Sequence, residues 1–102
     1  MERMEHVRGQ LFDGDQVVLE PIDGYLGCHA MSNGRKTWFG NFALPAAERA
    51  RVVAGNRYKL VLGDGRSGDI YVDIHDDSRR PGDYTAEFQI IGGLKDRRGL
   101  RH

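Results

Sequence analysis

The sequence is poor in cysteine, in net charge and in long apolar runs. Cys28 is the only cysteine, so no disulfide can form within the chain. The 15 Lys and Arg residues balance the 15 Asp and Glu residues, and the formal net charge at pH 7 is zero. Proteins that hold a partner by bulk charge carry an excess of one sign. The composition therefore disfavours a partner that is bound by net charge alone.

Membrane and export signals are also missing from the sequence. No run of about eighteen apolar residues occurs, as a membrane-spanning helix requires. Residues 1–6 mix charges with two methionines and lack the apolar stretch of a secretory signal. A lone cysteine is typical of a reducing compartment, because secreted domains usually pair theirs. We therefore expect a soluble cytoplasmic protein with no membrane partner.

Motifs that carry metal or nucleophilic chemistry are scarce. There is no Cys-x-x-Cys or His-x-x-x-His pair, so the usual ligand spacing of a zinc site is absent. Cys28 and His29 are adjacent, and neighbours in a strand point to opposite faces, which separates the thiol from the imidazole. Asp73 and His75 alternate with apolar residues and are expected on the solvent face. The sequence therefore predicts no enzyme, no metal and no cofactor.

A glycine-rich segment over residues 63–68 matches the pattern Gly-x-Gly-x-x-Gly. In dinucleotide-binding folds this pattern opens a helix whose N-terminus holds the pyrophosphate. Here residues 69–74 read Asp-Ile-Tyr-Val-Asp-Ile, which is a strand pattern. The segment is therefore predicted to be the turn of a β-hairpin rather than a nucleotide site.

Residues 76–82 partly resemble the Asp-x-Ser-x-x-Gly loop of PilZ domains, which are small barrels that bind cyclic di-GMP. Pro81 stands where that family has its glycine, and no Arg-x-x-x-Arg motif precedes the first strands. No binding residue of that family is therefore assigned to this chain.

The sequence contains a series of short β-strand patterns, and its length fits a single domain. It has 102 residues, and its 14 glycines punctuate runs rich in Val, Ile, Tyr and Phe. Alternating apolar residues predict strands over residues 5–12, 16–22, 25–31, 36–42, 57–62, 69–75 and 84–91. Pro45 and the alanines after it predict one short helix within residues 44–53, which would cover an open end of the sheet.

These elements predict a mainly all-β fold of six to seven short antiparallel strands with one short helix. A small, partly open barrel of the SH3-like or OB-like kind fits this pattern, and a small sandwich is the alternative. Residues 1–94 are assigned to this single domain. Residues 95–102 are basic, contain little to bury, and are predicted to form a disordered tail.

The segment 33–42 carries the strongest binding signal, because two cations adjoin aromatic rings. Arg35 and Lys36 precede Trp38 and Phe39, which point to opposite faces if the segment is a strand. One ring then belongs to the core, and the other can anchor a partner. The candidate binding residues are Arg35, Lys36, Trp38 and Phe39, together with Arg79 and Arg80 in a second polar loop.

Two functions are compatible with these residues. The first is a non-catalytic protein-interaction or ligand-binding module, which can also self-associate through an edge strand. The alternative is a barrel that binds single-stranded nucleic acid, with Trp38 and Phe39 stacking on bases while nearby Arg and Lys neutralise phosphates. The three arginines of residues 95–102 would contribute to that second function.

Overall fold

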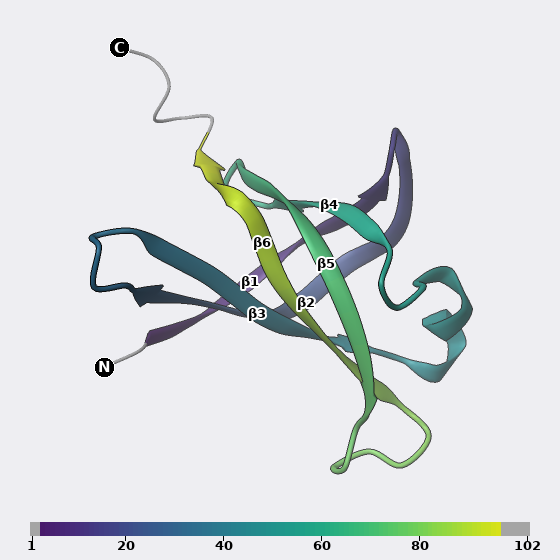
Figure 1. Ribbon diagram of the computed structural model, residues 1–102. Coiled ribbons are helices and arrows are strands. Elements are labelled where there is room, and N and C mark those ends of the chain that lie inside the picture. The colour runs from purple at the N-terminus through teal and green to yellow at the C-terminus, as the bar shows by residue number, and fades with distance from the viewer. Residues whose placement is uncertain (1–2, 97–102) are drawn as a thin grey trace.

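The chain folds as a small all-β barrel in a computed structural model that describes residues 3–96 (Figure 1). Its elements are β1 (Arg3–Asp13), β2 (Gln16–Ala30), β3 (Lys36–Leu44), the 3-10 helix η1 (Ala46–Arg51), β4 (Arg57–Leu62), β5 (Arg66–Asp76) and β6 (Tyr84–Asp96). The strand order is β1-β2-β3-β6-β5-β4, and every neighbouring pair is antiparallel. The ladder between β1 and β4 confirms the barrel prediction over the sandwich, and it closes a barrel that the sequence predicted as partly open.

Alternation along the strands builds the core as predicted. On β4 the side chains of Tyr58, Leu60 and Leu62 are buried, while Arg57 and Lys59 between them are exposed. The same pattern buries alternate residues of β5 and β6. Each large apolar side chain removed from water contributes about 1.5–3 kcal/mol, so this one face of each strand drives folding. The other face is left free to carry function.

The structure differs from the prediction at Asp23 and Gly24, where we expected a turn between two strands. β2 runs unbroken through both residues. A Cβ on Gly24 would lie 2.0 Å from the carbonyl oxygen of Asn41 and 2.7 Å from the Cα of Phe42 on β3. The glycine therefore marks a close approach of two backbones, and it does not mark a reversal of the chain.

The predicted helix is shorter than expected and covers less of the barrel end. η1 spans six residues of 3-10 helix and has no buried residue. Leu44 and Val52 are fully buried, but Leu44 belongs to β3 and Val52 follows the helix, whereas Ala47 is exposed. Within residues 3–96, no helix is long and apolar enough to cross a membrane.

The C-terminal strand extends past the domain boundary that the sequence suggested. β6 continues to Asp96, and Lys95 and Asp96 pair with Ser67 and Arg66 of β5. The rest of the predicted tail, residues 97–102, lies outside the described residues.

Candidate binding groove

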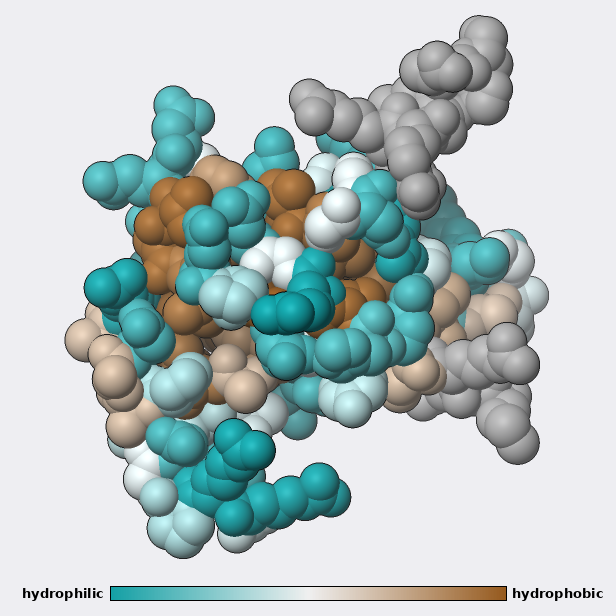
Figure 2. Space-filling view, turned by 180° about the vertical axis from the view of Figure 1, so that it is seen from behind, coloured by the Kyte–Doolittle hydropathy of each residue, from teal (hydrophilic) through white to brown (hydrophobic). Residues whose placement is uncertain are grey.

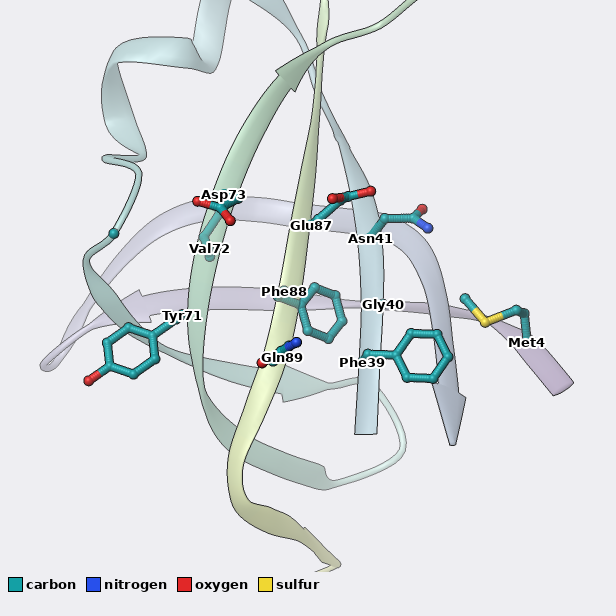
Figure 3. A pocket seen from close by; sticks show the side chains of 11 residues that line it. Met4, Phe39, Gly40, Asn41, Tyr71, Val72, Asp73, Glu87, Phe88 and Gln89 are labelled. Carbon is teal, nitrogen blue, oxygen red and sulfur yellow. The ribbon is translucent and has the colours of Figure 1, made fainter. Parts of the chain in front are cut away.

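A groove of about 690 Å³ lies on the outer face of the sheet formed by β3, β6 and β5. The register of these strands sets two rows of outward side chains across it. Phe39, Gln89 and Tyr71 are register partners in one row, and Asn41, Glu87 and Asp73 are partners in the next. Figure 3 shows both rows, with Phe39 and Tyr71 on either side of Gln89. We call this surface the outer groove.

Strand alternation explains why these side chains face solvent while their neighbours form the floor. Gly40, Val72 and Phe88 lie between the two rows in sequence, and all three are buried. Successive residues of a strand point to opposite faces, so a buried residue at each of these positions places its neighbours outside. The same pattern that builds the core therefore assembles the outer groove.

An apolar wall borders the groove on the side of β3. Phe39 is half-buried although it faces outward, because it lies over Gly27 of β2 together with Met4 of β1. A Cβ on Gly27 would come within 2.4 Å of the Met4 sulfur and 2.8 Å of the Phe39 Cζ. The bare glycine thus leaves the space in which these two side chains meet.

The polar part of the outer groove is acidic. Asp73 and Glu87 are exposed and directly opposite each other in the β5–β6 ladder. Glu87 contacts His75 at 3.0 Å, and no Lys or Arg is among the lining residues that the structure describes. Arg57 is the register partner of Tyr71, but its guanidinium is 2.9 Å from the carboxylate of Asp69, which lies two residues before Tyr71 on β5. The groove therefore has two carboxylates, two neutral amides and three aromatic rings, of which the Phe88 ring lies in the buried floor.

The structure separates the residues that the sequence singled out. Phe39 lines the outer groove, whereas Trp38 lies on the opposite face of β3, next to Cys28, and packs partly buried against the core. Arg35 ends the β2–β3 turn and Lys36 begins β3; both are exposed, and neither lines the groove. Because Trp38 and Phe39 point apart, they do not act together as one stacking surface.

Arg79 and Arg80 lie in the β5–β6 loop, beside a second hollow of about 420 Å³. The loop is held by its own carboxylates. Asp77 accepts a hydrogen bond from the Arg79 amide, and Asp83 accepts one from the Ala46 amide of η1, each at 2.9 Å. The lining of this hollow contains both arginines and carboxylates, so its charges are mixed and do not favour a ligand of either sign.

The sequence did not identify Tyr71, Asp73, Glu87 and Gln89 as members of one site. Their outward orientation follows from strand alternation, which the sequence does reveal. Their proximity to Phe39 depends on the pairing of β3 with β6, two strands far apart along the chain. No local pattern specifies that pairing.

Within residues 4–95 the side chains that could bind a metal or act as a nucleophile are scattered. No group of three His, Cys, Asp or Glu side chains there is placed to hold a metal ion. Asp73 and His75 are exposed on the outer face, as predicted. Cys28 faces inward beside Trp38, and His29 is exposed.

A separate ion-pair cluster surrounds Arg66 at the start of β5. The Arg66 guanidinium donates hydrogen bonds to Glu5 at 2.9 Å and to Asp64 at 2.8 Å. Hydrogen bonds from Glu5, and next from Asp64, raise the pKa of Arg66 above its ordinary value. Because this arginine is mostly covered and already paired, the cluster ties β1 to the β4–β5 turn and does not form a ligand site.

Exposed apolar side chains elsewhere do not form an equivalent site. Figure 2 shows the molecule from behind, where apolar side chains reach the surface between polar ones. One outward apolar side chain is Phe12, whose register partners are Val17 of β2 and Lys59 of β4. Apolar atoms make up more than half of ordinary protein surfaces, so such exposure alone does not mark a binding site.

Comparison of the chain with protein-family models, with curated proteins and with solved structures found no match. Inferences about function therefore come from the side chains of this chain alone.

Proposed function

We propose that the protein is a non-catalytic interaction barrel that binds an extended peptide segment of another protein in the outer groove. The observation that carries this proposal is the arrangement of Phe39, Gln89 and Tyr71 as one outward row on a hollowed sheet face. Rings supply apolar contact area, and the amides of Gln89 and Asn41 can both donate to and accept from a peptide backbone. The volume of the groove lies in the range of ordinary ligand sites.

Edge-strand pairing is less well supported as the binding mode. Each strand of the barrel has a hydrogen-bonded neighbour on both sides along part of its length, because the sheet closes on itself. Closure removes the continuous free edge that self-association through strand addition needs. A groove on the sheet face remains available whether or not the barrel is closed.

Nucleic acid is likewise less favoured at this site. A phosphate in the outer groove would meet the carboxylates of Asp73 and Glu87 and no Lys or Arg of its described lining. Like charges in contact disfavour binding, and nucleic-acid sites carry cations that neutralise phosphates. The absence of a nucleophile with an adjacent base among the lining side chains supports a binding role over catalysis.

Panning a random peptide library on the intact protein tests the proposal. A Phe39→Ala/Tyr71→Ala variant serves for counter-selection, and circular dichroism confirms its fold. We expect the library to yield peptides that bind the wild type and bind the variant at least about tenfold more weakly. If no peptide is enriched over the variant, the proposed function is wrong.

A further inference from the structure

We infer that the outer groove selects a peptide that carries a basic side chain, with Arg or Lys placed over the carboxylates of Asp73 and Glu87. This inference rests on the proposed function and adds the chemistry of the partner. It depends on the position of the two carboxylates, their unmatched charge and the rings beside them.

The position of the carboxylates is the first step. Asp73 and Glu87 are direct register partners on adjacent strands and both point outward. Cβ atoms of directly opposite residues are about 4.5–5.5 Å apart, so one long basic side chain laid over the pair can reach both carboxylates. A guanidinium presents several N–H donors in one plane and can donate to more than one carboxylate.

The second step is that this charge is only partly matched within the protein. His75 contacts Glu87 at 3.0 Å, whereas the Asp73 carboxylate has no ion pair or hydrogen bond with the described residues. Like charges placed directly opposite in a sheet repel and destabilise it. A cation bound between them removes this repulsion, so the free protein is poised to favour a cationic ligand over a neutral one.

The rings define what flanks the basic residue. Phe39 and Tyr71 are two strands apart in the row next to the carboxylates, which separates their backbones by roughly 9–10 Å. One side chain cannot contact both rings, but an extended peptide advances about 3.3 Å per residue and can reach both within several residues. The aliphatic stem of Lys or Arg then lies over Gln89, which separates the two rings in this row. The expected motif is therefore a basic residue with apolar residues on both sides.

The tightest library peptide provides the scaffold for the test. Its position closest to Asp73 is occupied in turn by Arg, Lys, citrulline and Glu, and binding is measured by fluorescence anisotropy at low and high salt. Citrulline keeps the shape of arginine without its charge. We expect Arg to bind about tenfold more tightly than citrulline, Glu to bind most weakly, and the preference for Arg to shrink as salt rises.

A double variant, Asp73→Asn/Glu87→Gln, keeps the size of both side chains and removes their charge. It should reduce the preference for Arg over citrulline to about twofold or less. The matched control is Asp13→Asn/Asp15→Asn at the exposed β1–β2 turn, which changes the net charge equally and should leave the preference unchanged.

The outcomes separate this inference from the proposed function. If the enriched peptides contain no basic residue, if citrulline binds as tightly as Arg, or if the preference survives in the double variant, the inference is overturned. In each of these cases the proposed function still stands, provided that Phe39→Ala/Tyr71→Ala weakens binding. Failure to enrich any peptide overturns both.

Discussion

Asp73 of β5 lies directly opposite Glu87 of β6, and both carboxylates project from the outer face of the barrel. Residues of opposite charge stabilise a sheet when they lie directly opposite each other on adjacent strands, and residues of like charge destabilise it. Both residues are exposed, so water and salt screen part of the repulsion. The sheet therefore keeps a locally unfavourable pair on the surface that we propose as its binding site.

The Asp73→Asn variant should accordingly be more stable than the wild type, while binding the basic peptide more weakly. Removing one of the two charges should raise the free energy of unfolding by about 0.2–1 kcal/mol, because the repulsion with Glu87 is lost. Urea denaturation at low and at high salt measures this change, which should decrease at high salt. Asp15→Asn at an exposed turn is the control and should change stability little. A destabilised Asp73→Asn variant would contradict the prediction.

Two glycines of β2 should differ in their sensitivity to alanine. A methyl group at Gly24 would meet backbone atoms of Asn41 and Phe42, which cannot move aside without separating β2 from β3. At Gly27 it would meet the ends of the Met4 and Phe39 side chains, which can rotate away. We expect Gly24→Ala to cost about 3 kcal/mol or more and Gly27→Ala about 1 kcal/mol.

Chemical denaturation of both variants checks this order. Gly27→Ala should in addition weaken peptide binding, because displacement of the Phe39 ring breaks the apolar wall of the outer groove. Equal losses of stability for the two variants would show that the backbones of β2 and β3 are not as close at Gly24 as described.

These glycines also show what the sequence could and could not reveal about the fold. Alternation over Arg57–Leu62 predicted that strand with its observed bounds, because a strand buried on one face leaves a period of two in its sequence. Gly24 carries the same local signal whether it forms a turn or a close contact between strands. Only the register of β2 against β3 distinguishes the two, and that register depends on contacts between distant segments.

For the candidate site, too, the sequence revealed the local features and did not reveal the long-range pairing. The outward direction of Phe39, Asp73 and Glu87 follows from alternation, and the sequence predicted that Asp73 faces solvent. Their assembly into one groove depends on the ladder that joins β3 to β6, two strands that η1, β4 and β5 separate along the chain. The emphasis on Arg35 and Lys36 came from adjacency in sequence, but these residues lie at the end of the β2–β3 turn and the start of β3, away from the outer groove.

The Arg66 cluster should contribute to stability and leave the ligand site unaffected. Its guanidinium bonds both Glu5 and Asp64, although the Glu5 side chain is about half exposed and the pair is therefore screened. Arg66→Met should cost about 1 kcal/mol, because it leaves two carboxylates near each other without a cation. Thermal unfolding measures this loss. A large loss of peptide binding in a folded Arg66→Met variant would contradict a purely structural role.

The neighbours Trp38 and Phe39 should give opposite results when each is changed to alanine. Trp38 packs against the core from inside the sheet, so its removal should cost about 2 kcal/mol, which is less than the ~3–5 kcal/mol typical of a fully buried ring. Folded Trp38→Ala protein should still bind the peptide. Phe39 lies outside, so Phe39→Ala should cost about 1 kcal/mol or less and should lose most of the binding.

Trp38 is the only tryptophan, so its fluorescence reports on the inner face of β3 alone. Its emission should shift to longer wavelength on unfolding, because the ring leaves the core and enters water. Titration with the groove-binding peptide should leave it nearly unchanged, since the peptide contacts the other face of the strand. Single-stranded oligonucleotides that quench Trp38 in the folded protein, or a folded Trp38→Ala variant that binds no peptide, would move the binding site to the inner face and contradict the assignment to the outer groove.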